Sequence, residues 1–139
     1  TKLEPGERAA VAAQISFYKE HRALLQRGRF IRLKSPYEGN DAAWMVVAPD
    51  RSEAIVAFFR ILAQASPGLW SLPLRGLEAQ ASYAVSAWPA GEGDAAETNN
   101  EGSRGGDELM SAGLLFGGDE WYAPRHGDFW SRLFLLKKQ

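Results

Sequence analysis

Three groups of acidic residues are the first candidates for chemistry, because carboxylates that share a cleft can act as acid and base or bind calcium. They are Asp107-Glu108, Asp119-Glu120 and Asp128. Their spacing does not match an EF-hand loop, and no motif around them indicates a cleft that would perturb a carboxylate pKa. We therefore expect solvated loop acids here rather than a catalytic pair or a calcium site.

The two histidines, His21 and His126, stand far apart in the sequence, and neither has a second metal-type ligand at a recognisable spacing. We expect His21 to be a half-buried packing residue on a helix, whereas His126 lies in a Pro-Arg-His-Gly loop. The chain has no cysteine, no Gly-X-Ser-X-Gly elbow and no phosphate-binding loop. The sequence thus predicts no catalytic residue, no metal site and no cofactor in this chain.

The aromatic residues offer a different chemistry, because the apolar face of a sugar ring packs on an exposed tryptophan or tyrosine. Trp121 and Tyr122 lie in a polar loop, so they are the best candidates for a carbohydrate or partner contact, although loop aromatics also serve simply to anchor a loop. Trp70 is a third, more ambiguous candidate. The remaining tryptophans lie in predicted strands and are expected in the core: Trp44, Trp88 and Trp130.

Composition limits the possible partners and surroundings. The 139 residues, 45% of them hydrophobic, suit one domain with a core of its own. A net charge of −1 gives no reason to expect nucleic acid or an anionic membrane as a partner. No stretch has the length of a membrane span or the features of a signal peptide, and the absence of cysteine fits a reducing compartment, so we expect a cytoplasmic protein. Because Thr1 stands where a Met would begin a chain, we expect either processing or a longer parent protein.

Residues 5–27 are predicted to form one amphipathic helix about 34 Å long. Pro5 suits the first helical position, and Gly28 is a natural stop after the last turn. A stripe that is apolar except for Arg22 follows helical spacing, with Phe17 and Leu24 widening it: Val11, Ile15, Tyr18, Arg22 and Leu25.

After Gly28 the hydrophobic pattern alternates, which predicts strands. About seven or eight short strands with turn signals between them favour an antiparallel β-sandwich of Greek-key type. A leucine six residues before Tyr83 suggests a tyrosine corner, in which the hydroxyl binds upstream backbone. Residues 89–106 and 117–127 are expected to be long polar loops. The clearest predicted strands are residues 29–33, 42–48, 53–63, 69–74, 83–88 and 128–136.

The hairpin of residues 42–63, with its turn at Pro49–Ser52, is the organising element of the predicted sandwich. One face of its second strand carries Ile55, Ala57, Phe59 and Ile61, and the other carries Val56, Phe58 and Leu62, interrupted by Arg60. A sandwich strand ordinarily buries one face and exposes the other to water. Because both faces here are apolar, we expect something besides the opposite sheet to cover the second one.

Whole segments of the chain carry a resemblance in the same order from end to end. They are Gln14–Arg22, Gly28–Asn40, Ala43–Val47, Leu74–Glu78, Tyr83–Val85, Gly106–Leu114 and Gly127–Phe134. Together they resemble the C-terminal portion of bacterial α-galactosidases of glycoside hydrolase family 36. The strongest parts are Ser35–Val47 and Gly106–Leu114, whereas residues 89–105 and 116–125 look like insertions of this sequence.

The resemblance implies a larger enzyme with an N-terminal β-supersandwich, a central (β/α)₈ barrel and a C-terminal antiparallel β-sandwich. Residues 1–28 would correspond to the last barrel helix and residues 29–139 to the C-terminal sandwich. Such enzymes retain anomeric configuration and use two barrel aspartates, the nucleophile lying in a Lys-Trp-Asp motif. This chain has no Lys-Trp-Asp, so no catalytic residue can be carried over to it.

Three functions follow as hypotheses. The first is an accessory domain of an α-galactosidase, inactive alone, that braces the catalytic barrel domain and contributes to homo-oligomer contacts. In this interpretation Val56, Phe58 and Leu62 form the face that meets the other domain, and the isolated chain would self-associate or bind a hydrophobic dye. The second is a carbohydrate-binding module that binds sugar weakly. The third, a free-standing small enzyme, lacks any constellation of nucleophile, base and orienting group.

Overall fold

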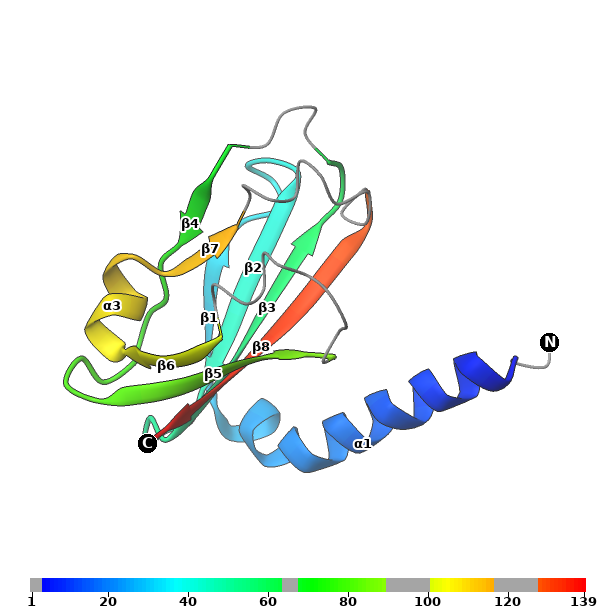
Figure 1. The fold of residues 1–139 in the computed structure, drawn as a ribbon, viewed down its shortest axis with the longest axis horizontal. Helices are drawn as coiled ribbons and strands as arrows, with labels where there is room; N and C mark the ends of the chain where they lie inside the picture. Colours follow the sequence, from blue (N-terminus) through cyan, green and yellow to red (C-terminus); the bar gives the residue numbers. More distant parts are fainter. Residues whose placement is uncertain (1–3, 64–67, 90–100, 117–127) are drawn as a thin grey trace.

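A long helix followed by a mostly antiparallel β-structure makes up the chain, as the sequence predicts (Figure 1). The computed structural model describes residues 4–63, 68–89, 101–116 and 128–139. The helices in these ranges are α1 (Pro5–Arg27) and α3 (Gly106–Ser111). The strands are β1 (Arg29–Lys34), β2 (Asp41–Val47), β3 (Glu53–Arg60), β4 (Trp70–Leu72), β5 (Ser82–Trp88), β6 (Gly102–Gly105), β7 (Leu114–Phe116) and β8 (Trp130–Lys138).

Six of these strands form one sheet in the order β1-β2-β3-β8-β5-β6, and β4 pairs with β7 in a second, two-stranded sheet. All pairs are antiparallel. The last strand of the chain, β8, is inserted between β3 and β5, with Val56 opposite Phe134 and Val85 opposite Leu136. The centre of the sheet therefore forms only when the C-terminal strand has joined it.

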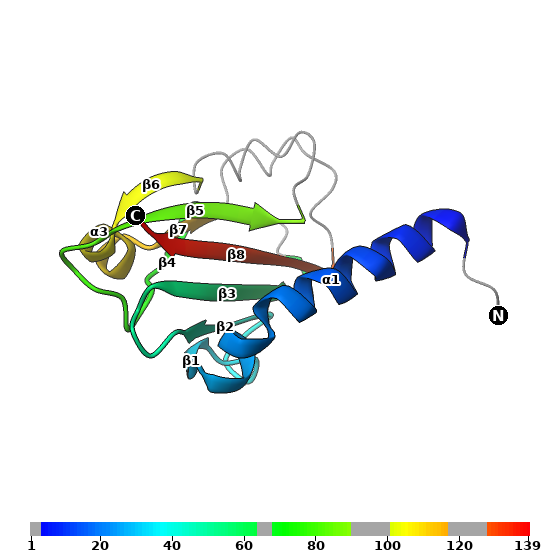
Figure 2. The same cartoon turned by 90° about the horizontal axis from the view of Figure 1, so that it is seen from below.

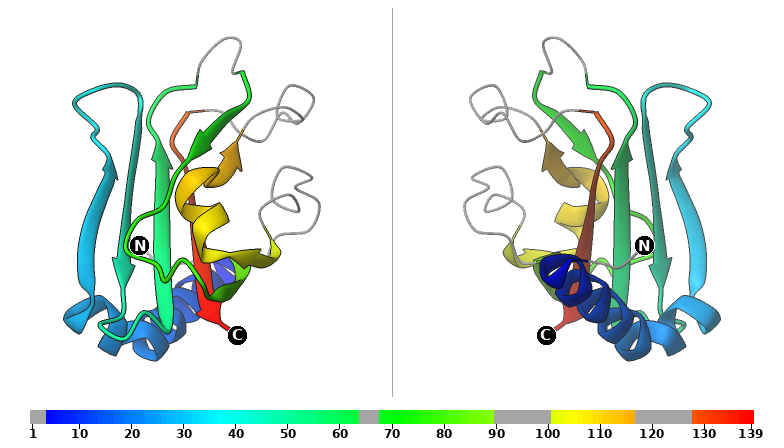
Figure 3. Two further views of the ribbon diagram at one scale, coloured as in Figure 1. Left: turned by 90° about the vertical axis from the view of Figure 1, so that its left-hand side faces the viewer. Right: turned by 90° about the vertical axis from the view of Figure 1, so that its right-hand side faces the viewer.

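The two layers differ greatly in size. The two-stranded sheet and α3 lie on one face of the large sheet, and α1 lies on the other (Figure 3). The main core lies between the large sheet and the smaller layer, and its largest fully buried side chains include Tyr83, Phe58, Phe134, Met45 and Leu109. We call the face of the large sheet toward this core the inner face and the face toward α1 the outer face.

Local chemistry explains where α1 begins and ends. Pro5 stands in the first turn, and the Glu4 backbone N–H donates a hydrogen bond of 2.8 Å to the Glu7 carboxylate. At the other end the Gly28 N–H donates to the Leu24 carbonyl oxygen at 2.7 Å. Gly28 has an extended backbone, and a Cβ there would collide with the Val46 side chain and the Leu24 carbonyl. The predicted stop is thus confirmed, but close packing against β2 rather than a left-handed backbone requires the glycine.

The hairpin turn between β2 and β3 forms as its residues predict. The Asp50 carboxylate accepts hydrogen bonds from the Ser52 N–H at 3.0 Å and from the Ser52 hydroxyl at 2.7 Å. The Arg51 N–H donates to the Ala48 carbonyl oxygen at 2.9 Å, and Arg51 itself has a positive φ of 58°. β3 ends at Arg60, three residues earlier than the predicted strand, so Ile61 and Leu62 lie beyond the sheet.

The tyrosine corner is present. The Tyr83 hydroxyl accepts a hydrogen bond from the Glu78 N–H at 3.1 Å and donates one to the Arg51 carbonyl oxygen at 2.9 Å. The ring is fully buried, so both hydrogen bonds are shielded from water. One side chain therefore joins the segment before β5 to the β2–β3 turn.

Residues 101–111 differ from the prediction. The expected loop of residues 89–106 contains β6, which pairs with β5, and the segment that follows is the helix α3, which was not predicted. The Gly106 N–H donates to the Ala81 carbonyl at 2.8 Å, and a Cβ at Gly106 would collide with the Glu78 carbonyl. These are contacts with a distant segment, which local patterns do not reveal.

Candidate interaction surface

The acidic candidates do not form a catalytic pair among the residues that the structure describes. Glu108 on α3 forms an ion pair of 2.7 Å with Arg104, and Asp107 accepts a hydrogen bond from its neighbour's N–H. Asp128 lies just before β8 and accepts the Ala63 N–H at 2.7 Å. Figure 1 shows α3 and the start of β8, which Asp128 precedes, at opposite ends of the sheet. Asp119 and Glu120 fall outside the described residues.

No metal site is formed by the histidines and acids of residues 4–63, 68–89, 101–116 and 128–139. His21 is only 5% exposed, which is deeper than the half-buried position expected from the sequence, and its ring lies 4.6 Å from that of Phe17. It packs between the helix and the sheet, as a core histidine does. His126 falls outside the described residues.

A buried charged cluster explains why Arg60 interrupts the apolar pattern of β3. The Arg60 guanidinium donates to the Asp41 carboxylate at 3.2 Å, and Lys34 donates to the other oxygen of the same carboxylate at 3.2 Å. The guanidinium also lies 5.6 Å from the Phe58 ring and 5.9 Å from the Trp130 ring. These partners stabilise the buried charge, so the cluster closes the end of the core.

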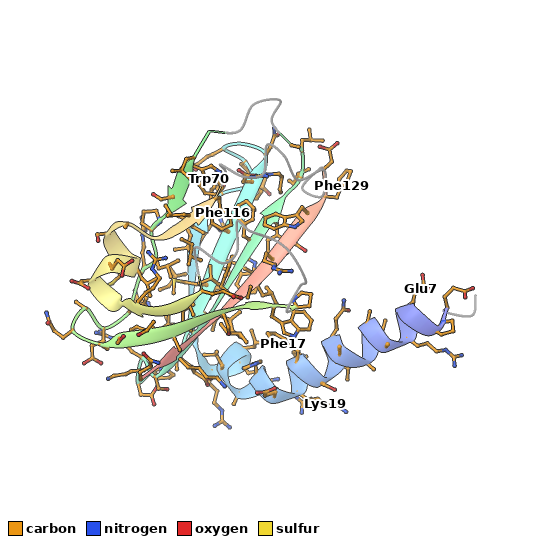
Figure 4. All side chains as sticks on the ribbon, viewed as in Figure 1. Glu7, Phe17, Lys19, Trp70, Phe116 and Phe129 are labelled. Atoms are coloured by element: carbon orange, nitrogen blue, oxygen red, sulfur yellow. The ribbon has the colours of Figure 1, made fainter. Side chains whose placement is uncertain are left out.

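Trp70, one of the three predicted carbohydrate or partner contacts, is half-buried in β4. Its ring stacks on Phe116 with centroids 4.7 Å apart, and the Lys34 ammonium lies 4.6 Å from the ring centroid (Figure 4). Much of this ring is therefore already engaged within the chain. Trp121 and Tyr122 fall outside the described residues, so their contact with sugar or a partner stays a prediction.

The outer face of the large sheet carries apolar side chains that the described residues bury only in part. The outward-pointing residues of the central strands are almost all apolar. The row that joins Val46, Ile55 and Leu135 across β2, β3 and β8 is covered by Leu24 of α1. The next row joins Trp44, Ala57, Leu133 and Trp88, and its two tryptophans stay half-buried.

The structure corrects the assignment of the two faces of β3. Val56 and Phe58, predicted to meet another domain, lie in the main core opposite β4 and β7, and Leu62 lies beyond the strand. The face of Ile55, Ala57 and Phe59 is the one that looks outward. Trp44 and Trp88, predicted as core, also lie on this outer face, whereas Trp130 packs against the main core as predicted. A second cover exists as expected, and α1 supplies part of it.

The helix α1 carries two stripes rather than one. The sheet-facing stripe runs along Ala10, Ala13, Gln14, Phe17, His21 and Leu24. The stripe predicted from the sequence runs along Val11, Ile15 and Tyr18, which are 39%, 49% and 45% exposed. At about 100° per residue the two stripes are roughly 110° apart around the helix. The stripe of Val11, Ile15 and Tyr18 thus stays exposed, with the Arg22 guanidinium of the same helix 5.8 Å from the Tyr18 ring centre. This exposure is the strongest sign of a missing neighbour.

A cleft opens where α1 leaves the sheet. Phe17 still contacts it, with its ring 4.3 Å from that of Trp88. One to two turns earlier the helix presents Ala10, Ala13 and Gln14, and a cavity of about 320 Å³ separates them from the outer face at Phe59, Trp88 and Leu133. Beyond it the first turns of α1 extend past the edge of the sandwich (Figures 1 and 2).

Comparison with known proteins identifies the family. The model of the glycosyl hydrolase family 36 C-terminal domain matches residues 41–136, which is more than half of the chain. This chain belongs to glycosyl hydrolase family 36. The resemblance stated from the sequence is therefore confirmed, and so is the β-sandwich of its C-terminal domain.

The relatives match the helix as well as the sandwich. α-Galactosidase AgaA of Geobacillus stearothermophilus is 43% identical over 137 residues, and α-galactosidase Mel36A of Lactobacillus acidophilus is 30% identical over 138 residues; each match covers 99% of this chain and 16% of the relative. The crystal structure of AgaA superposes with a TM-score of 0.81 at 42% identity, covering 99% of this chain and 17% of that chain. Both α1 and the sandwich thus occur in these larger proteins.

The chain spans about one sixth of the length of the relatives it matches. The match to a C-terminal domain therefore corresponds to a small part of the length of these relatives. Among the described residues no helix has the length and apolarity needed to cross a bilayer.

Proposed function

We propose that this chain is the C-terminal supporting domain of an α-galactosidase, in which the catalytic aspartates lie in a separate barrel domain. The parent enzyme would hydrolyse terminal α-galactosyl residues, and this chain alone would be inactive. The observation that carries the proposal is the exposed stripe Val11, Ile15 and Tyr18 on a helix that extends beyond its own sandwich.

The two-stripe helix suits an element shared between two domains. Residues 1–28 would be the last helix of the catalytic barrel, and residues 29–139 the sandwich that follows. The sheet-facing stripe anchors α1 to the sandwich through Leu24 and Phe17, and the second stripe would pack on the barrel. A rigid helix that takes part in both cores fixes one domain relative to the other, which a flexible linker does not.

The variant Ile15→Asp tests this proposal, with Ala12→Asp as the matched control. Position 12 lies away from both stripes and is exposed, so the control introduces the same charge on the same helix without touching either interface. In the full-length enzyme we expect Ile15→Asp to lower the melting temperature and the activity toward a chromogenic α-galactoside, while Ala12→Asp leaves both nearly unchanged. Equal behaviour of the two full-length variants would contradict the shared helix.

The same substitutions in the isolated chain complete the test. Because Ile15 is already about half exposed there, Ile15→Asp and Ala12→Asp should unfold at nearly the same denaturant concentration. The isolated chain should show no turnover of the chromogenic substrate, and clear turnover would end the claim that the catalytic residues lie elsewhere. Sedimentation of the isolated chain checks the related proposal of homo-oligomer contacts, since Ile15→Asp should reduce any self-association.

Carbohydrate binding by Trp70, Trp121 and Tyr122 is the alternative proposal. Trp70 supports it only with the part of its ring that Phe116 and Lys34 do not occupy. Calorimetric titration with galactose, melibiose and raffinose is the direct measurement. Binding that Trp121→Ala abolishes would favour this module, and no heat at millimolar sugar would exclude it.

A further inference from the structure

We infer that the cleft between α1 and the outer face of β3, β8 and β5 receives an apolar segment of the catalytic part of the same enzyme. The inference rests on the proposed function, but it concerns a different surface. The exposed stripe Val11, Ile15 and Tyr18 faces away from the cleft, whereas the cleft is lined by Ala10 and Ala13 on one side and Phe59, Trp88 and Leu133 on the other.

The distribution of side-chain size along α1 indicates that a third element fills this space. Where α1 contacts the sheet directly it uses large residues, Phe17 and Leu24. Along the same stripe, where the helix leaves the sheet, it uses alanines, which leave the cavity of about 320 Å³. An apolar cavity of about 150 Å³ holds one benzene ring, so this cleft has room for about two large apolar side chains.

The sheet side of the cleft is apolar and largely aromatic. Trp88 and Phe59 are half-buried by their neighbours in the sheet, and Leu133 lies between their strands. Trp44 continues this aromatic surface, with its ring 6.2 Å from that of Phe59. Gln14, Ser131 and Arg132 are the polar residues of the lining, and the first two have side chains that can hydrogen-bond the backbone of an incoming segment.

The direction of the chain identifies the occupant. The match is to a C-terminal domain, and the relatives are about six times longer than this chain, so in them most of the polypeptide precedes α1. That polypeptide arrives at the N-terminal end of α1, only about two turns from Ala10 at the cleft. Covalent attachment at this point gives an upstream segment an effective concentration in the millimolar range, which a separate molecule does not have.

A space-filling variant tests the inference, because it has opposite effects in the two forms of the protein. Ala13→Phe places a ring in the cleft. In the isolated chain it should leave the unfolding midpoint unchanged or raise it, since the cavity is empty there. In the full-length enzyme the new ring should compete with the natural occupant of the cleft. Limited proteolysis within α1 should then be about tenfold faster, which corresponds to ~1.4 kcal/mol of lost contact free energy. Ala12→Phe, which points away from the cleft, is the matched control.

Photo-crosslinking identifies the occupant directly. A diazirine-bearing leucine analogue at position 13 of the full-length enzyme should crosslink within one polypeptide to a peptide that precedes α1, and the same analogue at position 12 should not. Crosslinks only to a second copy of the enzyme, or only to residues within this 139-residue segment, would overturn the inference. If Ile15→Asp destabilises the full-length enzyme and Ala13→Phe does not, the inference fails while the proposed function stands; if neither has an effect, both fail.

Discussion

The two faces of the large sheet are both apolar in sequence, yet the fold treats them differently. On the inner face Val56, Phe58 and Phe134 are no more than 1% exposed, because β4, β7 and α3 cover them completely. On the outer face Ala57 and the residues under Leu24 are buried, but Trp44, Phe59 and Trp88 are half-buried and Phe30 at the edge is 57% exposed. The inner face therefore holds the domain together, and part of the outer face stays open for a further contact.

Truncation of Phe58 and of Phe59 should give the largest difference in stability between the two faces, because these adjacent residues point to opposite sides of the sheet. Phe58→Ala should lower the free energy of unfolding by about 3–5 kcal/mol, since it empties a fully buried site that contacts Trp70, Phe116 and Trp130. Phe59→Ala should cost less than half as much in the isolated chain. Denaturant titration of both variants measures the difference, and equal losses would mean that the two faces are equally covered.

Leu24→Ala measures how firmly the helix holds the outer face. Leu24 is buried against Val46 and Ile55, so its truncation should cost about 2–4 kcal/mol. Leu25 lies beside it and is half-buried, and Leu25→Ala serves as the control with a smaller expected loss. Amide exchange should show α1 losing protection in Leu24→Ala before the sheet does. A variant that keeps full protection in α1 would show that the helix is held by other contacts.

The variant Tyr83→Phe measures the contribution of the Tyr83 hydroxyl to stability separately from that of the ring, which lies on the inner face. The ring remains in the core, but the Glu78 N–H and the Arg51 carbonyl lose their partner, which should cost about 1–3 kcal/mol. Comparison of the unfolding midpoints of Tyr83→Phe and the parent chain gives the value. An unchanged midpoint would show that water replaces the hydroxyl and that the corner adds nothing to stability.

The smallest expected effect is a dependence on pH at the rim of the sheet. Lys138 and Glu78 form an ion pair of 2.6 Å, which lowers the pKa of the Glu78 carboxyl and raises the pKa of the Lys138 ammonium. The pair therefore stabilises the fold fully between pH 4.5 and pH 10.5, the ordinary pKa values of the two groups. The stabilisation is lost as the pH falls through the lowered pKa of Glu78 or rises through the raised pKa of Lys138.

Lys138→Met should reduce stability slightly at pH 7, because both partners are exposed to solvent. The difference from the parent chain should disappear at a pH well below 4.5, where Glu78 is protonated in both. Thermal unfolding of both proteins at pH 7 and at a pH well below 4.5 measures this difference in stability. A difference that persists in acid would point to packing of the lysine stem rather than charge. Phe58→Ala, by contrast, should cost the same at both pH values.

Much of the architecture could be predicted from local patterns. Pro5 and Gly28 mark the ends of α1, Asp50 and Ser52 form the predicted turn, and Tyr83 forms the predicted corner. β6 and α3 could not be predicted in this way. Their hydrogen bonds are to β5 and to the segment just before it, and their own residues, rich in glycine and charge, have the composition of a loop.

The candidate surface could be predicted only in part. The sequence showed that β3 has two apolar faces and that α1 has an apolar stripe at Val11, Ile15 and Tyr18. It could not say which face lies inward, because alternation fixes that two faces exist but not which of them meets another sheet. That choice was wrong for Val56 and Phe58, and the alanines that border the cleft carried no signal, since alanine is common in any helix.

The sequence by itself determined α1 and the main strands of this protein, the apolar character of both sheet faces, and the family resemblance that comparison confirmed. Each depends on residues close together in the chain or on their order. The tertiary structure decided which face became the core, where α1 leaves the sheet, and that a cleft opens there. These depend on the pairing of β3 with β8, whose residues meet only when distant segments have folded together, so no local pattern can specify them.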